Sequence, residues 1–196
     1  EPLKLKGGCI HHDHGLLGAA SYDRAEERKV ELLKSAGFNA IRSAHNPPAP
    51  ALLDACDRLG MLVINESFDS WRVGKSTNDY HLYFDAWWQR DTESMVKRDR
   101  NHPSVIMWSI GNEVVETFEK SDGALWSQRQ AEFVRSLDAT RPVTQGIRMM
   151  FEEIFARMAE FGATSMDEAL NLPDPDPATE SWGRRSATFV QPLDVV

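Results

Sequence analysis

The stretch Pro103-Ser-Val-Ile-Met-Trp-Ser-Ile-Gly-Asn-Glu113 joins a mainly apolar segment to two polar side chains. Its segment 105–110 predicts a buried strand of the kind that parallel sheets contain. Asn112 and Glu113 follow that strand directly. Because the active sites of parallel α/β folds lie at the carboxyl ends of the strands, this stretch indicates both a fold and the place of a site.

Strands and helices alternate over residues 1–147. Apolar segments predict strands at 3–10, 38–43, 61–64 and 142–146, and amphipathic segments predict helices at 23–36, 51–59, 84–100 and 123–137. Asp23 and Glu26 resemble a capping box at the start of the first helix, and Gly37 and Gly60 are placed to end helices. This order predicts a parallel α/β sheet.

Polar residues follow four consecutive predicted strands. They are His11, His12 and Asp13, then His45 and Asn46, then Asn65 and Glu66, and finally Asn112 and Glu113. A purely structural sheet has no need to repeat this pattern, so we expect these side chains to form one site at one edge of the sheet.

Composition excludes several classes of function. The chain has 196 residues, with 22 lysines and arginines against 30 acidic residues and a formal charge of −8. This acidic balance argues against nucleic acid or an anionic membrane as the main partner. No apolar run reaches the ~18 residues of a membrane span. No glycine-rich phosphate loop or Gly-x-Ser-x-Gly elbow follows a strand, and no cofactor is predicted.

The individual candidates leave alternatives open. A carboxyl group at the position of Glu113 can serve as a general acid, or it can cap a loop or pair with an arginine. Arg42 can fix a carboxylate of the site, form a structural ion pair with Glu66, or do both. Trp71 lies in the long polar and aromatic connection after the third strand, and an aromatic face suits a sugar ring.

His12-Asp-His14 has two chemical interpretations besides a solvated turn. His-x-His after a first barrel strand is a metal-ligand spacing, and with His45 it predicts a metal-dependent hydrolase. The same residues can instead form a rim that binds a polyhydroxylated ligand. No cysteine or carboxylate cluster completes a ligand set at clear spacing, so we predict no metal.

Four stretches resemble the catalytic TIM barrel of glycoside hydrolase family 2, and most of all its β-galactosidase branch. They are Leu5-Lys-Gly-Gly-Cys-Ile-His-His-Asp13, Gly37-Phe-Asn-Ala-Ile-Arg-Ser-Ala-His-Asn-Pro47, Leu53-Asp-Ala-Cys-Asp-Arg-Leu-Gly-Met-Leu-Val63 and the segment 98–113. The resemblance is strong over 1–147 and weak over 148–196, where Pro192-Leu-Asp-Val-Val196 resembles the sixth strand. It implies an incomplete (β/α)8 barrel of about five to six βα units, as one domain over 1–196.

The resemblance also implies a mechanism. It implies retaining hydrolysis of terminal β-glycosidic bonds, β-galactosides above all, with Glu113 as the general acid/base. Asn112 matches the residue that binds the sugar 2-hydroxyl, and Arg42 matches an arginine near the nucleophile. His45 and His12 match sugar-binding histidines, and Glu66 matches a supporting carboxylate. A magnesium requirement is not carried over, because Ser70-Trp71-Arg72 stands where the magnesium-binding branch has Glu-x-His.

The family's nucleophile is a glutamate after the seventh strand, which five predicted strands and part of a sixth do not reach. We therefore expect the isolated chain to be inactive, and to associate with itself or with missing parts of a parent chain. The alternatives are a non-catalytic carbohydrate-binding or assembly fragment and, less favoured, the metal-dependent hydrolase.

Overall fold

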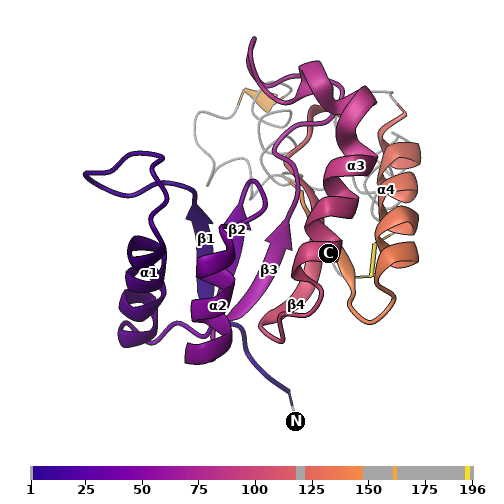
Figure 1. Cartoon of the computed structure of the whole chain (residues 1–196). Helices are drawn as coiled ribbons and strands as arrows, with labels where there is room; N and C mark the ends of the chain where they lie inside the picture. The colour runs from indigo at the N-terminus through magenta and orange to yellow at the C-terminus, as the bar shows by residue number, and fades with distance from the viewer. Residues whose placement is uncertain (1, 118–121, 148–160, 163–192, 195–196) are drawn as a thin grey trace.

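A computed structural model describes residues 2–117, 122–147, 161–162 and 193–194. Strands and helices alternate along the chain (Figure 1). The elements are β1 (Gly7–His11), α1 (Asp23–Ser35), β2 (Ala40–Ala44), α2 (Pro50–Leu59), β3 (Leu62–Glu66), α3 (His81–Asp99), β4 (Val105–Asn112), a 3-10 turn η1 (Val115–Thr117), α4 (Gly123–Leu137) and β5 (Val143–Gly146).

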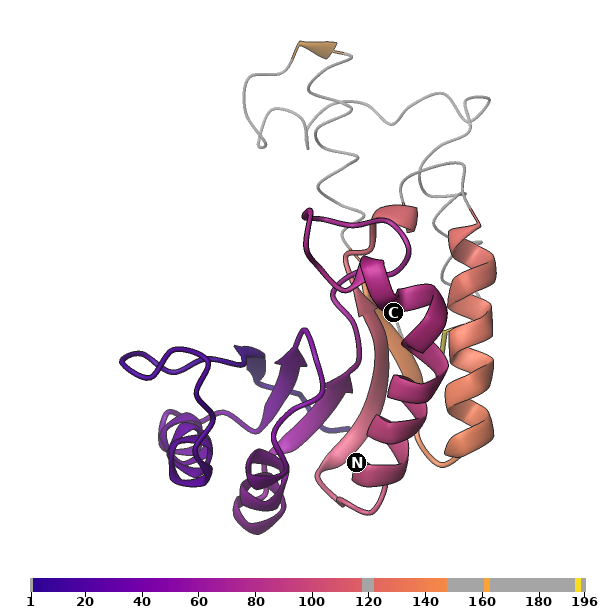
Figure 2. The ribbon, with the colours of Figure 1, turned by 45° about the horizontal axis from the view of Figure 1, so that its top comes forward.

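The five strands form one parallel sheet in the order β1-β2-β3-β4-β5. Helices α1 to α4 cover one face of this sheet, and Figure 2 tilts the carboxyl ends of the strands toward the viewer. Sequential parallel strands joined by helices on one face are the arrangement of a partial (β/α)8 barrel, as the sequence predicts.

Local signals explain where the helices begin and end. Pro50 opens α2 at a position that needs no N–H donor, and Gly60 closes it with φ of 69°. The expected capping box of α1 is wrong, because Tyr22 is the N-cap and makes no side-chain cap bond. Glu26 is instead buried and accepts hydrogen bonds from His14 and Ser21.

All five strands differ by a few residues from the sequence prediction, and the differences in β1 and β4 follow from their pairing. β1 begins at Gly7 rather than at residue 3, because its partner β2 begins only at Ala40 and the two residues are paired in register. β4 runs on to Asn112, past a register shift against β5 between Ser109 and Asn112. The predicted site residue Asn112 therefore belongs to the strand itself.

The hydrophobic core fills the space between the helices and the sheet. Its largest fully buried side chains include Trp71, Trp108, Phe84, Ile41 and Leu53. The other face of the sheet carries Arg42, Glu66 and Ser109, which point toward the inside of the barrel. Among the described helices, none is long and apolar enough to cross a membrane.

The expected sixth strand lies almost entirely outside the described residues. Asp194 is described, and it contacts β5: its N–H donates to the Val143 carbonyl at 2.9 Å, while its carboxylate accepts from the Val143 N–H at 2.8 Å. Leu193 packs against the core. The predicted strand at this position stays a prediction.

Candidate active site at the carboxyl ends of the strands

The predicted site residues from β2, β3 and β4 meet at one edge of the sheet. Arg42 points inward from β2, His45 follows β2, Glu66 ends β3, and Asn112 ends β4. The Ala44–His45 peptide bond is cis. All four side chains belong to one hydrogen-bonded cluster, as the repeated polar strand ends predict.

Glu66 is the centre of this cluster. It is 0% exposed, and its two carboxylate oxygens accept from three groups. His45 Nδ1 lies 2.7 Å from Oε1, while Arg42 Nη1 at 3.1 Å and Ser109 Oγ at 2.6 Å donate to Oε2. The Ser43 hydroxyl accepts from the Glu66 backbone N–H at 3.0 Å. A buried carboxylate with this set of donors is fixed in place.

Arg42 links β3 to β4. Besides Glu66 it reaches Asn112, with Nη2 donating to Oδ1 at 3.2 Å, and it contacts the Cys9 sulfur at 3.1 Å. Gly146 leaves room for this guanidinium, since a Cβ at Gly146 would lie 2.2 Å from Arg42 Nη1. The arginine thus forms the expected ion pair with Glu66 and also orients the Asn112 amide.

The Asn112 amide is held from its other side as well. Its Nδ2 donates to Asp69 at 2.9 Å, and Lys75 Nζ donates both to Asp69 at 2.6 Å and to the backbone carbonyl of Asn112 at 2.8 Å. Burial raises the pKa of the Asp69 carboxyl, but hydrogen bonds from Lys75 and Asn112 outweigh it, so that pKa lies below its usual value. The partners therefore assign both ends of the Asn112 side-chain amide: Oδ1 accepts from Arg42, and Nδ2 donates to Asp69.

Glu113 differs from every other member of the cluster. Its φ is 44°, in the left-handed region that side chains other than glycine rarely adopt, and its N–H donates to the Gly146 carbonyl at 2.7 Å. The side chain is half-buried. Within the described part of the chain, its carboxyl has no hydrogen-bond or ion-pair partner. Such backbone conformations cluster at functional sites, where the surrounding structure holds them.

The structure corrects the predicted sugar contact of Trp71 and agrees with the supporting role that the resemblance implies for Glu66. Trp71 is 0% exposed, donates its indole N–H to the Ile110 carbonyl at 3.0 Å and stacks on Phe84, so neither ring face is open to a sugar. Its ring lies under Gly111, where it supports the end of β4. Glu66 is also fully buried, and it holds Arg42 and His45 rather than facing a ligand.

The histidines do not form the metal site that was considered. His12 is exposed, His14 Nε2 lies 2.9 Å from the Glu26 carboxylate, and His45 is engaged by Glu66. His11 packs edge-on against His45, with ring centroids 5.1 Å apart. Over residues 2–117 and 122–147, ligand atoms in metal-like proximity occur only in Asp54, Asp57 and His102, where Asp57 and His102 bond each other at 2.7 Å.

Sequence reasoning did not single out Lys75, Ser109 or Asp69 as site residues. Ser109 stands two residues after Met107 on the inward face of β4, so strand alternation was a usable signal for it. Lys75 lies in the irregular connection after β3, where no periodicity assigns a direction to a side chain.

Comparisons with known proteins agree with this geometry. The family model for the TIM barrel domain of the glycosyl hydrolases family 2 matches residues 1–182. Beta-galactosidase BoGH2A of Bacteroides ovatus is 45% identical over 173 residues, covering 73% of this chain and 20% of that protein. A putative beta-glucuronidase of Formosa agariphila is 42% identical over 147 residues, covering 74% of this chain and 13% of that protein.

Solved structures give the same result. A family 2 glycosyl hydrolase of Bacteroides cellulosilyticus is 50% identical with a TM-score of 0.77, covering 98% of this chain and 21% of that one. A β-galacturonidase of Eisenbergiella tayi, solved with galacturonate, is 32% identical with a TM-score of 0.63, covering 76% and 26%. The chain thus spans between 13% and 26% of the length of these relatives. Its sequence match, its parallel barrel strands and its cluster at their carboxyl ends place the chain in glycosyl hydrolase family 2, as part of the TIM barrel domain.

Proposed function

We propose that this chain supplies the acid/base half of a retaining β-glycosidase site, acting on terminal β-galactosides. The observation that carries the proposal is the Glu113 carboxyl: it is half-buried and has no partner among the described residues. It stands beside an Asn112 side-chain amide that is held by Arg42 and Asp69, while Lys75 binds the Asn112 backbone carbonyl. A carboxyl that is not used for structure remains available for proton transfer.

In the proposed reaction, Glu113 protonates the leaving oxygen and then deprotonates the attacking water. The nucleophile is a second carboxylate from a later barrel strand, outside residues 1–196, which would stand ~5–5.5 Å from Glu113. Glu66 does not take this role, because it is 0% exposed and its oxygens are engaged by Arg42, His45 and Ser109. Asn112, His45 and the exposed His12 contact the sugar hydroxyls, and Arg42 lies close to the incoming nucleophile.

The choice of a β-galactoside follows the 45% identical relative, which is a β-galactosidase. The 42% identical relative is described as a putative β-glucuronidase, so acidic sugars are the alternative substrate class. The pairing of this chain with further barrel strands, or with a second copy of itself, stays a prediction.

Two assays with a nitrophenyl β-galactoside test the proposal. The isolated chain should hydrolyse it at less than roughly 1% of the rate of BoGH2A, since the covalent route needs the missing nucleophile. A chimera, in which residues 2–147 replace the matching segment of BoGH2A, should be active and should lose about 10²–10⁴-fold in rate on Glu113→Gln. An active chimera that is insensitive to Glu113→Gln would refute the role of Glu113.

A further inference from the structure

The peptide bond between Asn112 and Glu113 is held from both sides. Its N–H, which belongs to Glu113, donates to the Gly146 carbonyl at 2.7 Å. Its carbonyl, which belongs to Asn112, accepts from Lys75 Nζ at 2.8 Å. Because a peptide bond is planar, the two partners together fix its orientation. This fixed peptide directly precedes the Cα of Glu113, the residue with a φ of 44°.

Lys75 supplies the stronger of these two contacts. The Gly146 contact joins neutral main-chain groups of the paired strands β4 and β5. The Lys75 contact comes from a charged side chain in the connection after β3, and a hydrogen bond from an ionised donor is about twice as strong as a neutral one. It is also the contact that a substitution can remove without changing the sheet.

The Lys75 ammonium is placed by a second acceptor. Nζ donates to Asp69 Oδ1 at 2.6 Å, and the same oxygen accepts from Asn112 Nδ2 at 2.9 Å. Lys75, Asp69 and Asn112 therefore form a closed ring of three contacts, which includes both the backbone carbonyl and the side-chain amide of Asn112. The Lys75 side chain is 27% exposed, so water surrounds it only in part.

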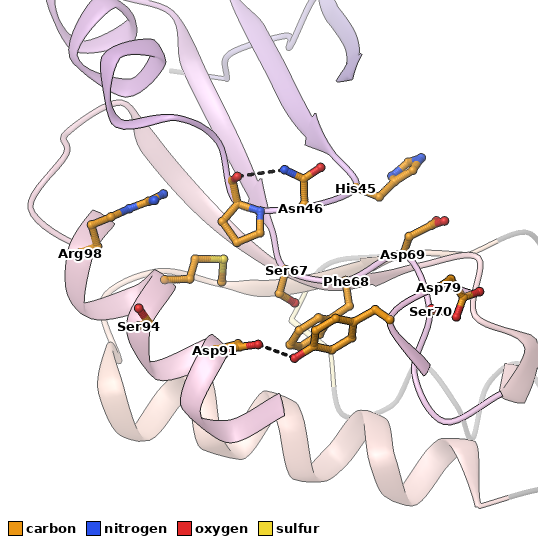
Figure 3. Close-up of a pocket in the computed structure, with 13 residues that line it drawn as sticks. His45, Asn46, Ser67, Phe68, Asp69, Ser70, Asp79, Asp91, Ser94 and Arg98 are labelled. Atoms are coloured by element: carbon orange, nitrogen blue, oxygen red, sulfur yellow. Dashed lines mark hydrogen bonds between the residues drawn. The ribbon is translucent and has the colours of Figure 1, made fainter. Parts of the chain in front are cut away.

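The backbone that carries Lys75 is fixed as well. Asp79 Oδ2 accepts from the N–H groups of Lys75 at 2.7 Å and Ser76 at 2.9 Å. Asp79 Oδ1 accepts from the N–H of His81, the first residue of α3, at 2.9 Å. Asp69 and Asp79 also line a cavity of about 400 Å³ (Figure 3). Polar contacts, rather than close packing on that side, hold this part of the connection.

We propose that Lys75 is a positioning residue for proton transfer: it holds the Asn112–Glu113 peptide and thereby keeps the Glu113 carboxyl in the place where the leaving oxygen arrives. Lys75 acts through the backbone, since the Glu113 carboxyl has no partner among the described residues. A displacement of about 1 Å can cost about 10²-fold in rate, so this hold matters for catalysis. The catalytic part rests on the proposed function, whereas the hold on the peptide can be tested without it.

Amide hydrogen exchange in the 196-residue chain tests the hold on the peptide. Lys75→Met keeps the length of the side chain but removes its charge and its donors. The Glu113 amide should then exchange about tenfold faster, the scale of one charge-assisted hydrogen bond, while the amides of β2 keep their rates. Lys97→Met is the matched control, because it removes an ion pair with Glu93 on α3. An unchanged rate at Glu113 in Lys75→Met would overturn the proposal.

Leaving-group dependence in the BoGH2A chimera tests the catalytic part. Lys75→Met should lower kcat for a phenyl β-galactoside about 10- to 100-fold, because this leaving group needs a well-placed proton donor. Bond cleavage in a dinitrophenyl β-galactoside, which needs no proton, should fall far less. Lys97→Met should affect neither substrate. A merely structural role of Lys75 would lower both rates equally, and that result, or no loss at all, would overturn the positioning role.

Glu113→Gln separates this proposal from the proposed function. If Glu113→Gln slows the phenyl substrate while Lys75→Met does not, the positioning role fails and the proposed function stands. If Lys75→Met speeds exchange at Glu113 while Glu113→Gln leaves phenyl hydrolysis unchanged, the proposed function fails and the hold on the peptide stands.

Discussion

Glu66 and Glu113 stand at the ends of neighbouring strands, yet their surroundings are opposite. Glu66 is 0% exposed and accepts from Arg42, His45 and Ser109. Glu113 is half-buried, has a left-handed φ of 44°, and has no carboxyl partner among the described residues. The Glu66 carboxylate holds the site together. The Glu113 carboxyl makes no structural contact with the described residues.

This difference explains how two glutamates can serve two purposes, Glu66 as a structural group and Glu113 as the proposed general acid. A buried carboxylate whose two oxygens both accept from fixed donors has no oxygen to offer to a substrate. A general acid needs the reverse, namely a group without fixed donors that a substrate oxygen can reach. The comparison makes four predictions about the 196-residue chain, each measurable by denaturant unfolding.

The largest effect is expected for Glu66→Gln. The substitution keeps the size of the side chain but leaves the Arg42 charge without its buried counter-charge, which costs about 3–5 kcal/mol of unfolding free energy. Glu113→Gln is the matched control and should change stability by less than about 0.5 kcal/mol. Equal losses in the two variants would mean that Glu66 is not the structural member of the pair.

Gly146→Ala should have the next largest effect. A Cβ there would lie 2.2 Å from Arg42 Nη1 and 3.1 Å from Asn112 Oδ1, so the guanidinium must leave its place. Overpacking of this kind costs about 1–3 kcal/mol. Gly8→Ala on β1 is the control, because nothing lies within 4 Å of its added Cβ. If Gly146→Ala leaves the free energy of unfolding unchanged, the position of Arg42 is not fixed.

Glu113→Gly should stabilise the chain by about 1 kcal/mol, because glycine adopts a positive φ without a steric penalty. Glu113→Ala removes the same carboxyl but keeps the strained backbone, so it should not stabilise. Comparing the two separates backbone strain from side-chain effects. If both variants have the stability of the parent, the left-handed conformation at Glu113 carries no cost.

The smallest effect concerns Asp69 and pH. Because the folded-state pKa of Asp69 is lowered, its contribution to stability is present above the unfolded pKa of ~3.9 and is lost as the pH falls below it. Asp69→Asn should therefore reduce only slightly the loss of unfolding free energy at acidic pH, since the Asp69 side chain is 48% exposed. An unchanged curve would indicate that Lys75 and Asn112 do not favour the charged carboxylate.

Much of this molecule could be predicted from sequence. The bounds of α4 were predicted to the residue, and the other elements within a few residues, because hydrophobic periodicity and glycine stops are local signals. The Arg42–Glu66 pair was one of the alternatives that the sequence left open for Arg42, because neighbouring parallel strands bring their ends together.

What the sequence could not reveal depends on contacts distant along the chain. The burial of Trp71 follows from its packing under Gly111 and against Phe84, and the connection that carries it has no periodicity to indicate this. The role of Lys75 depends on a carbonyl 37 residues away. The left-handed φ of Glu113 accompanies a hydrogen bond from its N–H to the Gly146 carbonyl, a residue 33 positions later, and nothing in the segment around Glu113 indicates this contact.

The most direct test of the division between the two glutamates is leaving-group dependence in the BoGH2A chimera. A dinitrophenyl group departs without protonation, whereas a phenyl group needs a proton from the general acid. With Glu113→Gln, hydrolysis of the phenyl β-galactoside should fall about 10²–10⁴-fold, and bond cleavage in the dinitrophenyl β-galactoside should fall far less. Equal losses for both substrates would contradict the account, because Glu113 would then not be the proton donor.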